Sequence, residues 1–331
     1  MSNKKIKVAV LGLGYMGQNH TRILSSLPNV DLVAICDADN TKNSELSQKY
    51  KVRSYTKVED LIKKEKLDAI FICLPTTFHY KASKLALEKE IAVFVEKPIC
   101  DKINQAQDLI AYSKEKKVPI MVGHIERFNP VVKEIKKRLA SGELGKILHI
   151  HTQRFSPPPA RAQDVSAIVD LATHDVDIIR YLLSEEPIRI FSETETRYHK
   201  KEDLMSAVLR FQSGIIGLVE VSWLHPTKIR SLSVVGENGM YLANYLTQEL
   251  LFYRQTEKIM KKGAIPTPDQ NWADVVKIAF EAKEPLQIEL EAFINALESK
   301  SNMPVTAEEG LVALKLTHKF SLSGKGHKIV K

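Results

Sequence analysis

The feature that most constrains the fold is a glycine-rich segment close to the start of the chain. It reads Gly12-Leu13-Gly14-Tyr15-Met16-Gly17 and separates an apolar run at residues 6–11 from an amphipathic segment at 17–27. In a strand–turn–helix unit, the first glycine permits the tight turn and the second lets a pyrophosphate approach the backbone. The third allows helix and strand to pack closely, and the helix N-terminus supplies amide donors. The segment therefore predicts a Rossmann-type dinucleotide site formed by this turn.

An acidic residue at the expected distance extends this site. Asp37 stands 20 residues beyond Gly17 and directly follows a second apolar run, residues 32–36. A carboxylate at this point accepts hydrogen bonds from the adenosine ribose hydroxyls and repels a 2′-phosphate. We therefore expect NAD to bind in preference to NADP, a preference that the nearby Lys42 would temper.

The distribution of apolar residues divides the chain into two parts. Up to Gly123, short runs rich in Val and Ile alternate with amphipathic segments, as is typical of parallel strands buried on both faces. Residues 1–123 are therefore predicted to form an NAD-binding α/β domain with a doubly wound parallel sheet. Beyond this point, strand-like runs separated by glycines indicate a meander of largely antiparallel strands. Residues 124–331 are predicted to form a second domain, for substrate binding and oligomerisation.

Composition excludes several classes of partner. The net charge is +8, but the lysines are spread along the chain without interleaved aromatic residues, so we expect a solvated surface and no nucleic-acid partner. The charge could still help attract an anionic small molecule. The three cysteines have no C-x-x-C spacing. The N-terminus lacks the apolar core of a signal peptide, and no apolar stretch is long enough for a membrane span. These observations predict a cytoplasmic protein with reduced thiols and no membrane partner.

The segment Glu96-Lys97-Pro98 carries polar side chains directly after the apolar run at residues 92–95. The carboxyl ends of strands in an open α/β sheet face the ligand crevice. A lysine there can hydrogen-bond a substrate hydroxyl and help transfer its proton, while Glu96 could restrain Lys97 or contact the nicotinamide ribose. From these residues alone, an exposed charged strand end is an equally good interpretation.

A second candidate lies in a helical segment of the second part. Asp170 and His174 are four residues apart, so they share one helix face. His174 could accept the proton of a secondary alcohol, and Asp170 could orient its imidazole or bind a neighbouring hydroxyl. An ordinary surface pair is the commoner outcome for these residues taken alone. A metal site of His174, Asp175 and Asp177 is excluded, because such closely spaced helical positions point in different directions.

Taken together, these landmarks resemble the Gfo/Idh/MocA oxidoreductase family over essentially the whole chain. They are the glycine segment, Asp37, Leu74-Pro75-x-x-x-His79, Glu96-Lys97-Pro98 and Asp170-x-x-x-His174. The resemblance implies a Rossmann domain, a C-terminal α/β domain with a large open sheet, and hydride transfer at a sugar or cyclitol hydroxyl. It implies catalytic roles for Lys97, Asp170 and His174, with Pro75, His79, Glu96 and Lys97 among the cofactor contacts.

A finer resemblance concerns the substrate. The segments at residues 123–130 and 164–175 are similar to those of UDP-N-acetylglucosamine 3-dehydrogenases. Such a substrate carries a diphosphate, for which Arg127, Arg154 and Arg161 offer bidentate donors. Each arginine could instead form an ordinary ion pair, which is the commoner role.

The predicted reaction is NAD-dependent oxidation of a small-molecule sugar. In it His174 accepts the hydroxyl proton and Lys97 stabilises the developing alkoxide, although the sequence leaves open which of the two is the base. Two alternatives stay open: an inositol or free-sugar dehydrogenase of the same family, and a non-catalytic, dinucleotide-responsive regulator. Because an open sheet must cover its outer face, a homodimer or homotetramer is expected.

Overall fold

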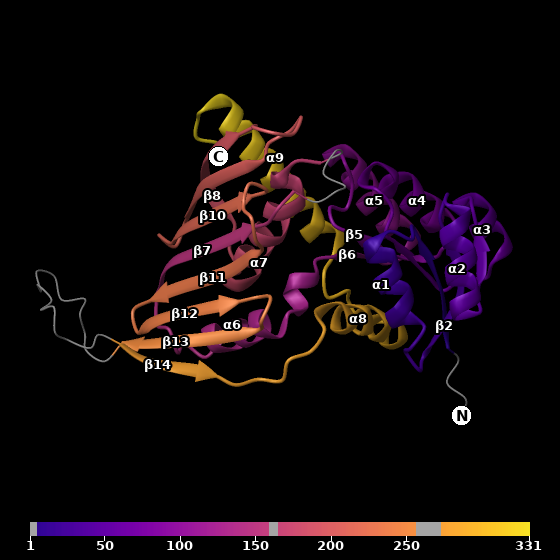
Figure 1. Cartoon of the computed structure of the whole chain (residues 1–331), viewed down its shortest axis with the longest axis horizontal. Coiled ribbons are helices and arrows are strands. Elements are labelled where there is room, and N and C mark those ends of the chain that lie inside the picture. Colours follow the sequence, from indigo (N-terminus) through magenta and orange to yellow (C-terminus); the bar gives the residue numbers. More distant parts are fainter. Residues whose placement is uncertain (1–4, 159–164, 256–272) are drawn as a thin grey trace, which may run out of the picture. The chain divides into compact units, whose positions relative to one another are not determined.

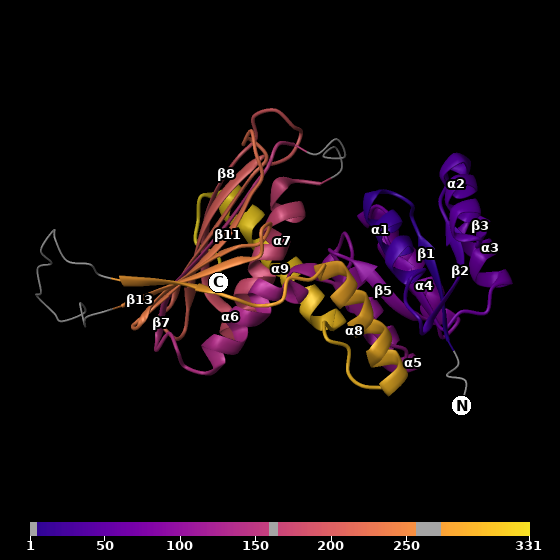
Figure 2. The ribbon, with the colours of Figure 1, turned by 60° about the horizontal axis from the view of Figure 1, so that its bottom comes forward.

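A computed structural model describes residues 5–158, 165–255 and 273–331. The chain forms two compact units (Figures 1 and 2). The first consists of Met1–Ile125 and Glu284–Lys315, and the second of Glu126–Lys283 and Leu316–Lys331. Arg161, one of the three arginines predicted to bind substrate, lies outside the described residues.

The first unit is built on a parallel sheet of six strands in the order β3-β2-β1-β4-β5-β6. The strands are β1 Ile6–Leu11, β2 Val30–Cys36, β3 Arg53–Tyr55, β4 Ala69–Ile72, β5 Ala92–Glu96 and β6 Ile120–Gly123. The helices between them are α1 Tyr15–Leu24, α2 Asn40–Tyr50, α3 Val58–Lys64, α4 Thr76–Glu88 and α5 Ile103–Lys116. All four residues of the central strand β4 are buried, which explains why its sequence shows no polar alternation. The predicted doubly wound sheet is confirmed.

A distant segment completes this unit. Helix α8, Pro285–Ser299, places Phe293 edge-on against Phe71 and Phe94, with ring centroids 5.3 and 5.6 Å apart. The backbone N–H of Val122 in β6 donates to the carbonyl of Val305, 3.3 Å away. The structure therefore assigns residues 284–315 to the first unit, whereas the sequence prediction placed all of 124–331 in the second. The apolar face of α8 is the physical reason, because it packs on the aromatic core under the parallel sheet.

The second unit is built on an eight-stranded sheet in the order β14-β13-β12-β11-β7-β10-β9-β8. Its strands are β7 Ile147–Phe155, β8 Pro187–Glu195, β9 Leu204–Phe211, β10 Ile216–Ser222, β11 Ile229–Gly236, β12 Gly239–Asn244, β13 Glu249–Gln255 and β14 Ala273–Ile278. Its helices are α6 Pro130–Ala140 and α7 Thr173–Leu183, together with the end of α9 Ala307–Gly326, whose residues up to Lys315 belong to the first unit. Every strand pair is antiparallel except β7–β10. The expected large, mostly antiparallel sheet is confirmed.

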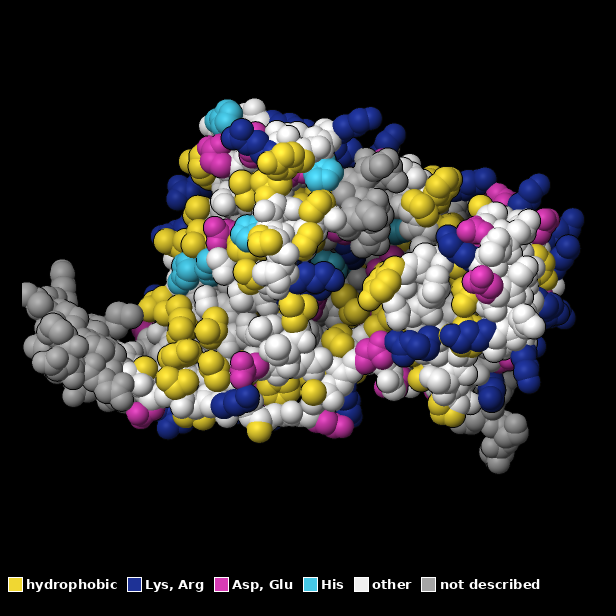
Figure 3. Space-filling view, in the orientation of Figure 1, with side chains coloured by type: hydrophobic (Ala, Val, Ile, Leu, Met, Phe, Trp, Pro, Cys, Tyr) yellow, Lys and Arg dark blue, Asp and Glu magenta, His cyan; other side chains and the backbone are white. Residues whose placement is uncertain are grey.

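The two faces of this sheet differ. Helices α6 and α7 lie on the same side of it (Figure 2). On the opposite face, Val208 of β9 and Ile216 of β10 are exposed, and Figure 3 shows hydrophobic side chains over the strands of this unit. In β7 the residues alternate accordingly, with Ile150, Thr152 and Arg154 buried toward the helices. Within the described residues, no helix combines the length and apolar character that a membrane span requires.

Candidate active site

The glycine turn joins β1 to α1 and has the shape of a phosphate cradle. Gly12 has a φ of +84°, and a Cβ there would lie 2.5 Å from the carbonyl oxygen of Cys73. A Cβ at Gly17 would lie 1.7 Å from the carbonyl oxygen of Gly12, whereas one at Gly14 would meet no protein atom within 4 Å. Gly12 and Gly17 are thus required by backbone packing, and Gly14 leaves open space beside the first turn of α1. A pyrophosphate fits this arrangement, because α1 begins at Tyr15 and presents its free amides there.

Asp37 fastens this turn to the end of β2. Its Oδ2 accepts a hydrogen bond from the backbone N–H of Leu13 at 2.6 Å, and its Oδ1 accepts one from the N–H of Asp39 at 2.9 Å. The sequence predicted a ribose contact for Asp37, which stays a prediction, and did not predict this structural link. Lys42 pairs with Asp39, Nζ to Oδ2 3.4 Å, so its charge is partly compensated locally. The carboxylates of Asp37 and Asp39 therefore lie together after β2, and the charge of Lys42 is directed to one of them.

Glu96 faces inward at the end of β5. It is buried, and its Oε1 lies 2.9 Å from Nε2 of His20, a fully buried residue of α1. Burial alone would favour the protonated carboxyl, but the hydrogen bond and charge of His20 outweigh it and lower the pKa of Glu96. Of the two roles considered, restraint of the Lys97 segment fits this geometry. The predicted contact of Glu96 with the cofactor stays a prediction, since 12% of its side chain is exposed and Oε1 alone is bound to His20.

His79 also differs from its predicted role. Only 1% of the residue is exposed, and its ring lies between two carbonyl oxygens, Nδ1 2.9 Å from Pro98 and Nε2 2.8 Å from Leu74. Burial lowers the pKa of His79, although both carbonyls favour its protonated form. His79 thus ties the loop after β4 to the loop after β5 and is too buried to be a direct cofactor contact. Pro75, at the start of α4, is exposed.

Lys97 is half-buried between buried neighbours, and the Lys97–Pro98 peptide is cis. It follows β5 directly, just as the glycine turn follows β1 and Asp37 follows β2. Because these strands are parallel, all three lie at the carboxyl edge of the sheet, where ligands of such folds bind. The first unit therefore combines a dinucleotide cradle and a lysine at one edge.

In the second unit, Asp170 lies in a π-helical turn, Ile168–Ala172, that leads directly into α7. His174 is the second residue of α7, and both side chains are half-buried. Sequence reasoning expected one regular helix, whereas the structure inserts this wider turn, a feature that often marks functional sites. The two residues nevertheless remain the accessible polar groups of the segment.

Arg154 and Arg127 are not available to a substrate, contrary to the prediction. Arg154 is 1% exposed; its Nε donates to Oδ2 of Asp175 at 3.0 Å and its Nη1 to Oε1 of Glu126 at 2.8 Å. Burial disfavours the guanidinium charge, but the two carboxylates outweigh this and raise the pKa of Arg154. Arg127 forms a buried bidentate pair with Asp177, at 2.7 and 2.6 Å.

These ion pairs involve two residues of the metal site that the sequence analysis considered, Asp175 and Asp177. Asp175 and Asp177 each bind an arginine, and the described part of the chain contains no group of three or more side chains arranged to hold a metal ion.

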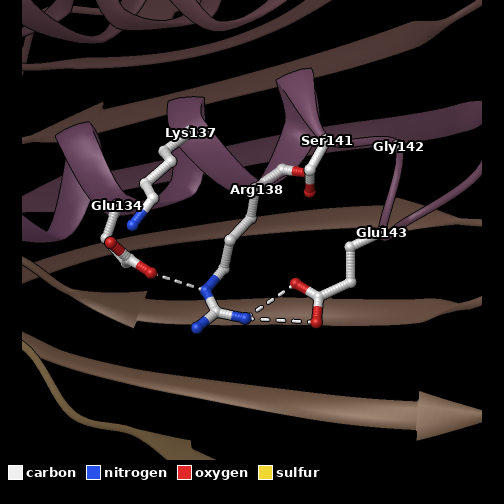
Figure 4. A pocket seen from close by; sticks show the side chains of 6 residues that line it. All are labelled: Glu134, Lys137, Arg138, Ser141, Gly142 and Glu143. Carbon is white, nitrogen blue, oxygen red and sulfur yellow. Dashed lines mark hydrogen bonds and ion pairs between the residues drawn. The ribbon is translucent and has the colours of Figure 1, made fainter.

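A surface pocket at the end of α6 has a structural explanation (Figure 4). Arg138 lies between two acids, with Nε 2.7 Å from Glu134 and Nη1 2.8 Å from Glu143. The hydroxyl of Tyr241 donates to Glu143 as well. Arg138 and its two acids therefore satisfy one another, and none of the predicted site residues lines the pocket.

Comparison with known proteins agrees with both units. The sequence matches the oxidoreductase family with an NAD-binding Rossmann fold over residues 6–124 and the GFO/IDH/MocA C-terminal domain over residues 132–242. It is 22% identical to UDP-N-acetylglucosamine 3-dehydrogenase of Acidithiobacillus ferrooxidans, over 88% of each chain. It is 28% identical to myo-inositol 2-dehydrogenase of Thermotoga maritima, over 66% of this chain and 68% of that one.

Solved structures show the same fold. A structure of the Acidithiobacillus ferrooxidans enzyme superposes with a TM-score of 0.86 at 20% identity, covering 97% of this chain and 98% of that one. An oxidoreductase from Agrobacterium radiobacter, solved with NAD+, L-tartaric acid and magnesium, gives 0.85 at 17% identity, covering 99% and 98%. With both domain families matched in order along the sequence, the chain belongs to the GFO/IDH/MocA family of oxidoreductases.

Proposed function

We propose that this dehydrogenase oxidises a secondary hydroxyl of a sugar, with NAD+ as oxidant and a nucleotide sugar such as UDP-N-acetylglucosamine as the first candidate substrate. The pattern of burial carries the proposal. From residue 91 to residue 100, Lys97 is the one residue that is not buried. From residue 166 to residue 179, Asp170 and His174 are the polar residues that are not buried. All residues of both stretches are described, and a packed core would not leave these three accessible.

The chemistry of these side chains suits oxidation of an alcohol. His174 accepts the hydroxyl proton, and Asp170 orients the imidazole and stabilises its positive charge. Lys97 donates a hydrogen bond to the same oxygen and stabilises the negative charge that develops on it. The C–H bond breaks as the C=O bond forms, which leaves a ketone. When bound, NAD+ supplies the acceptor for the hydride that leaves the carbinol carbon.

Asp37 and Asp39 support NAD over NADP as the cofactor. Their carboxylates lie together at the end of β2, and a 2′-phosphate would bring further negative charge to them. Lys42, the basic residue that tempered the sequence prediction, is paired with Asp39.

The experiment is an NADH-release assay of the purified protein against UDP-N-acetylglucosamine, myo-inositol and free hexoses, with NAD+ and NADP+ in parallel. Lys97→Ala and His174→Ala are each expected to lower kcat by about 100-fold or more while NAD binding is retained. Near-wild-type turnover of either variant would remove that residue from the mechanism. Tighter binding of NADP than of NAD would overturn the cofactor assignment.

A second candidate substrate is an inositol. The relative from Thermotoga maritima is named a myo-inositol 2-dehydrogenase and has the higher identity of the two reported. Of the three arginines first given for a diphosphate, Arg127 and Arg154 are in buried ion pairs, which leaves Arg161, outside the described residues. Turnover of myo-inositol alone in the assay would favour it, and NAD binding without any turnover would favour a regulator. Cytoplasmic location and homodimeric or homotetrameric assembly stay predictions.

A further inference from the structure

Arg230 occupies a singular position in the second unit. It is the second residue of β11 and pairs with Arg154 of β7 across the antiparallel ladder. Residues directly opposite each other in such a ladder project to the same face. Arg230 therefore lies on the face that also carries the buried Arg154 and its two acids, Glu126 and Asp175.

The acids on this face are already satisfied by Arg154. Oε1 of Glu126 accepts from Arg154 Nη1 at 2.8 Å and Oε2 accepts from Asn129 at 3.1 Å, while Asp175 binds Arg154 with both oxygens. Arg230 approaches Glu126 only to 3.7 Å, beyond hydrogen-bond distance. Within the described part of the chain, this ion pair is its sole charged contact, and its guanidinium donates no hydrogen bond to protein.

The guanidinium is nevertheless partly withdrawn from water. Its side chain is 32% exposed, and burial together with the neighbouring Arg154 lowers the pKa of Arg230. A half-buried guanidinium with five donors and no acceptor at hydrogen-bond distance is an unsatisfied group that a ligand can complete. Arg154, which lies opposite Arg230, binds Asp175, and Asp175 directly follows His174 in α7. The segment of the candidate catalytic pair therefore packs on the face of the sheet that carries Arg230.

A neighbouring side chain, that of Tyr245, carries a second unsatisfied donor, which is buried. The backbone N–H of Tyr245 donates to the carbonyl of Arg230 at 3.0 Å, and the Tyr245 ring lies 5.5 Å from the guanidinium carbon of Arg154. The residue is 4% exposed, and in the described structure its hydroxyl has no hydrogen-bond partner. Burial raises the pKa of Tyr245 well above its usual value, which keeps this hydroxyl a donor. A buried hydroxyl of this kind needs an acceptor from water or ligand.

We propose that Arg230 binds an oxyanion of the substrate beside Asp170 and His174; the buried Tyr245 hydroxyl is not one of its direct donors. The inference rests on the proposed function and narrows it to substrates that carry a carboxylate or a phosphate. A guanidinium binds either group through two parallel hydrogen bonds. Arg230 thereby takes the role that the sequence had given to Arg127 and Arg154.

The test compares substrates that differ in charge. Initial rates are measured with UDP-N-acetylglucosamine, D-glucuronate and neutral myo-inositol for wild type, Arg230→Gln and Arg230→Lys. The matched control is Arg189→Gln, an exposed arginine of β8 in the same sheet. The ratio of kcat/KM for the preferred anionic substrate to that for myo-inositol is expected to fall about 10- to 100-fold in Arg230→Gln, as for a lost hydrogen bond to a charged group. Arg230→Lys should fall less, and Arg189→Gln should match wild type. Which of the two anions is affected identifies the source of the oxyanion.

Two results would overturn the inference. The first is that Arg230→Gln loses kcat/KM equally for anionic and neutral substrates. The second is that the wild-type enzyme oxidises myo-inositol and that neither UDP nor D-glucuronate inhibits this reaction; the proposed oxidation of a polyol would then still hold. Binding of UDP and of D-glucuronate is also measured by calorimetry. If no substrate is oxidised yet one of these anions binds to wild type and not to Arg230→Gln, the proposed oxidation fails and the oxyanion site stands. Thermal unfolding of each variant verifies the fold, and Arg230→Lys keeps the test decisive if Arg230→Gln is unstable.

Discussion

Replacing Arg154 by methionine tests whether this arginine stabilises the fold or binds substrate. The substitution keeps an apolar stem of similar length but leaves Glu126 and Asp175 buried without their shared cation. Removing one partner of a buried ion pair costs about 3–5 kcal/mol, because the remaining charge is uncompensated. Each kcal/mol lowers Tm by about 2–4 °C in a domain of 150–250 residues, so a fall of about 6–20 °C is expected. Calorimetry or circular dichroism measures it directly.

Arg138→Met is the matched control. Arg138 also lies between two carboxylates, but 29% of its side chain is exposed (Figure 4). Solvent-exposed pairs contribute about 0–1 kcal/mol, so Tm should change by no more than a few degrees. If Arg154→Met kept the wild-type Tm and instead raised KM for an anionic substrate, the reasoning would be refuted and Arg154 would be a substrate ligand.

The pH dependence of Arg154→Met gives an independent check. Burial already raises the pKa of Asp175 in the wild type, and Arg154 opposes that rise. Without Arg154 the pKa of Asp175 in the folded protein rises further above its unfolded value. Such a group destabilises the fold at high pH and ceases to do so as pH falls through the folded pKa, where it becomes protonated. The Tm difference from wild type should therefore narrow as the pH is lowered through the folded-state pKa of Asp175; a constant difference would contradict a charge-based explanation.

Three further predictions concern the first unit. Asp37→Ala should weaken NAD binding by about tenfold and raise the NADP-to-NAD affinity ratio, because it removes an acceptor for the ribose and a charge that repels phosphate; fluorescence titration measures both, and an unchanged ratio would contradict this. His79→Ala loses its contact with the Pro98 carbonyl and should lower kcat more than NAD affinity, with about 1–3 kcal/mol of destabilisation; a lower Tm with wild-type kcat would leave His79 a purely structural role. Gly310→Ala places a Cβ 2.7 Å from Val122 Cγ2 and should cost about 1–3 kcal/mol in chemical denaturation, so an unaltered midpoint would contradict it.

The parallel sheet was largely readable from the sequence because its strands are buried on both faces. Continuous apolar runs predicted five of its strands, including the fully buried β4. The edge strand β3 escaped, because its three residues are exposed or half-buried and carry no apolar run. Helix α8 was expected as a helix but not as part of this unit. The amphipathic pattern of α8 predicts that one face of the helix is buried. It does not predict that this face packs against Phe71 and Phe94 of the first unit.

The far edge of the second sheet shows a different limit. Strands β12 and β13 alternate between buried and half-buried residues, but apolar side chains occupy both sets. Met240 and Leu242 are half-buried, whereas Tyr241 and Ala243 are buried. The sequence therefore lacks the alternation of polar and apolar residues by which a one-sided strand is recognised.

The candidate site divides along similar lines. Backbone requirements and motif spacing located the glycine turn, Lys97, Asp170 and His174, because these depend on residues close together in the chain. Buried partners were beyond reach, since the acids that bind Arg154 come from residues 28 and 21 positions away, on other elements. A histidine in a motif could likewise contact a ligand or connect two loops. The burial of His79 supports the second role.

The register of β7 with β11 finally decides which arginine remains for a ligand. It places Arg154 and Arg230 opposite each other on one face, beside Glu126 and Asp175. Arg154 is buried and binds both acids at hydrogen-bond distance. Arg230 therefore keeps only a 3.7 Å ion pair with Glu126. An oxyanion bound to Arg230 would provide charged hydrogen-bond acceptors, which the described protein atoms do not provide. A neutral polyol would provide only uncharged acceptors. Substrate selectivity would then depend on how many carboxylates Arg154 takes from Arg230 rather than on the number of arginines near the motif.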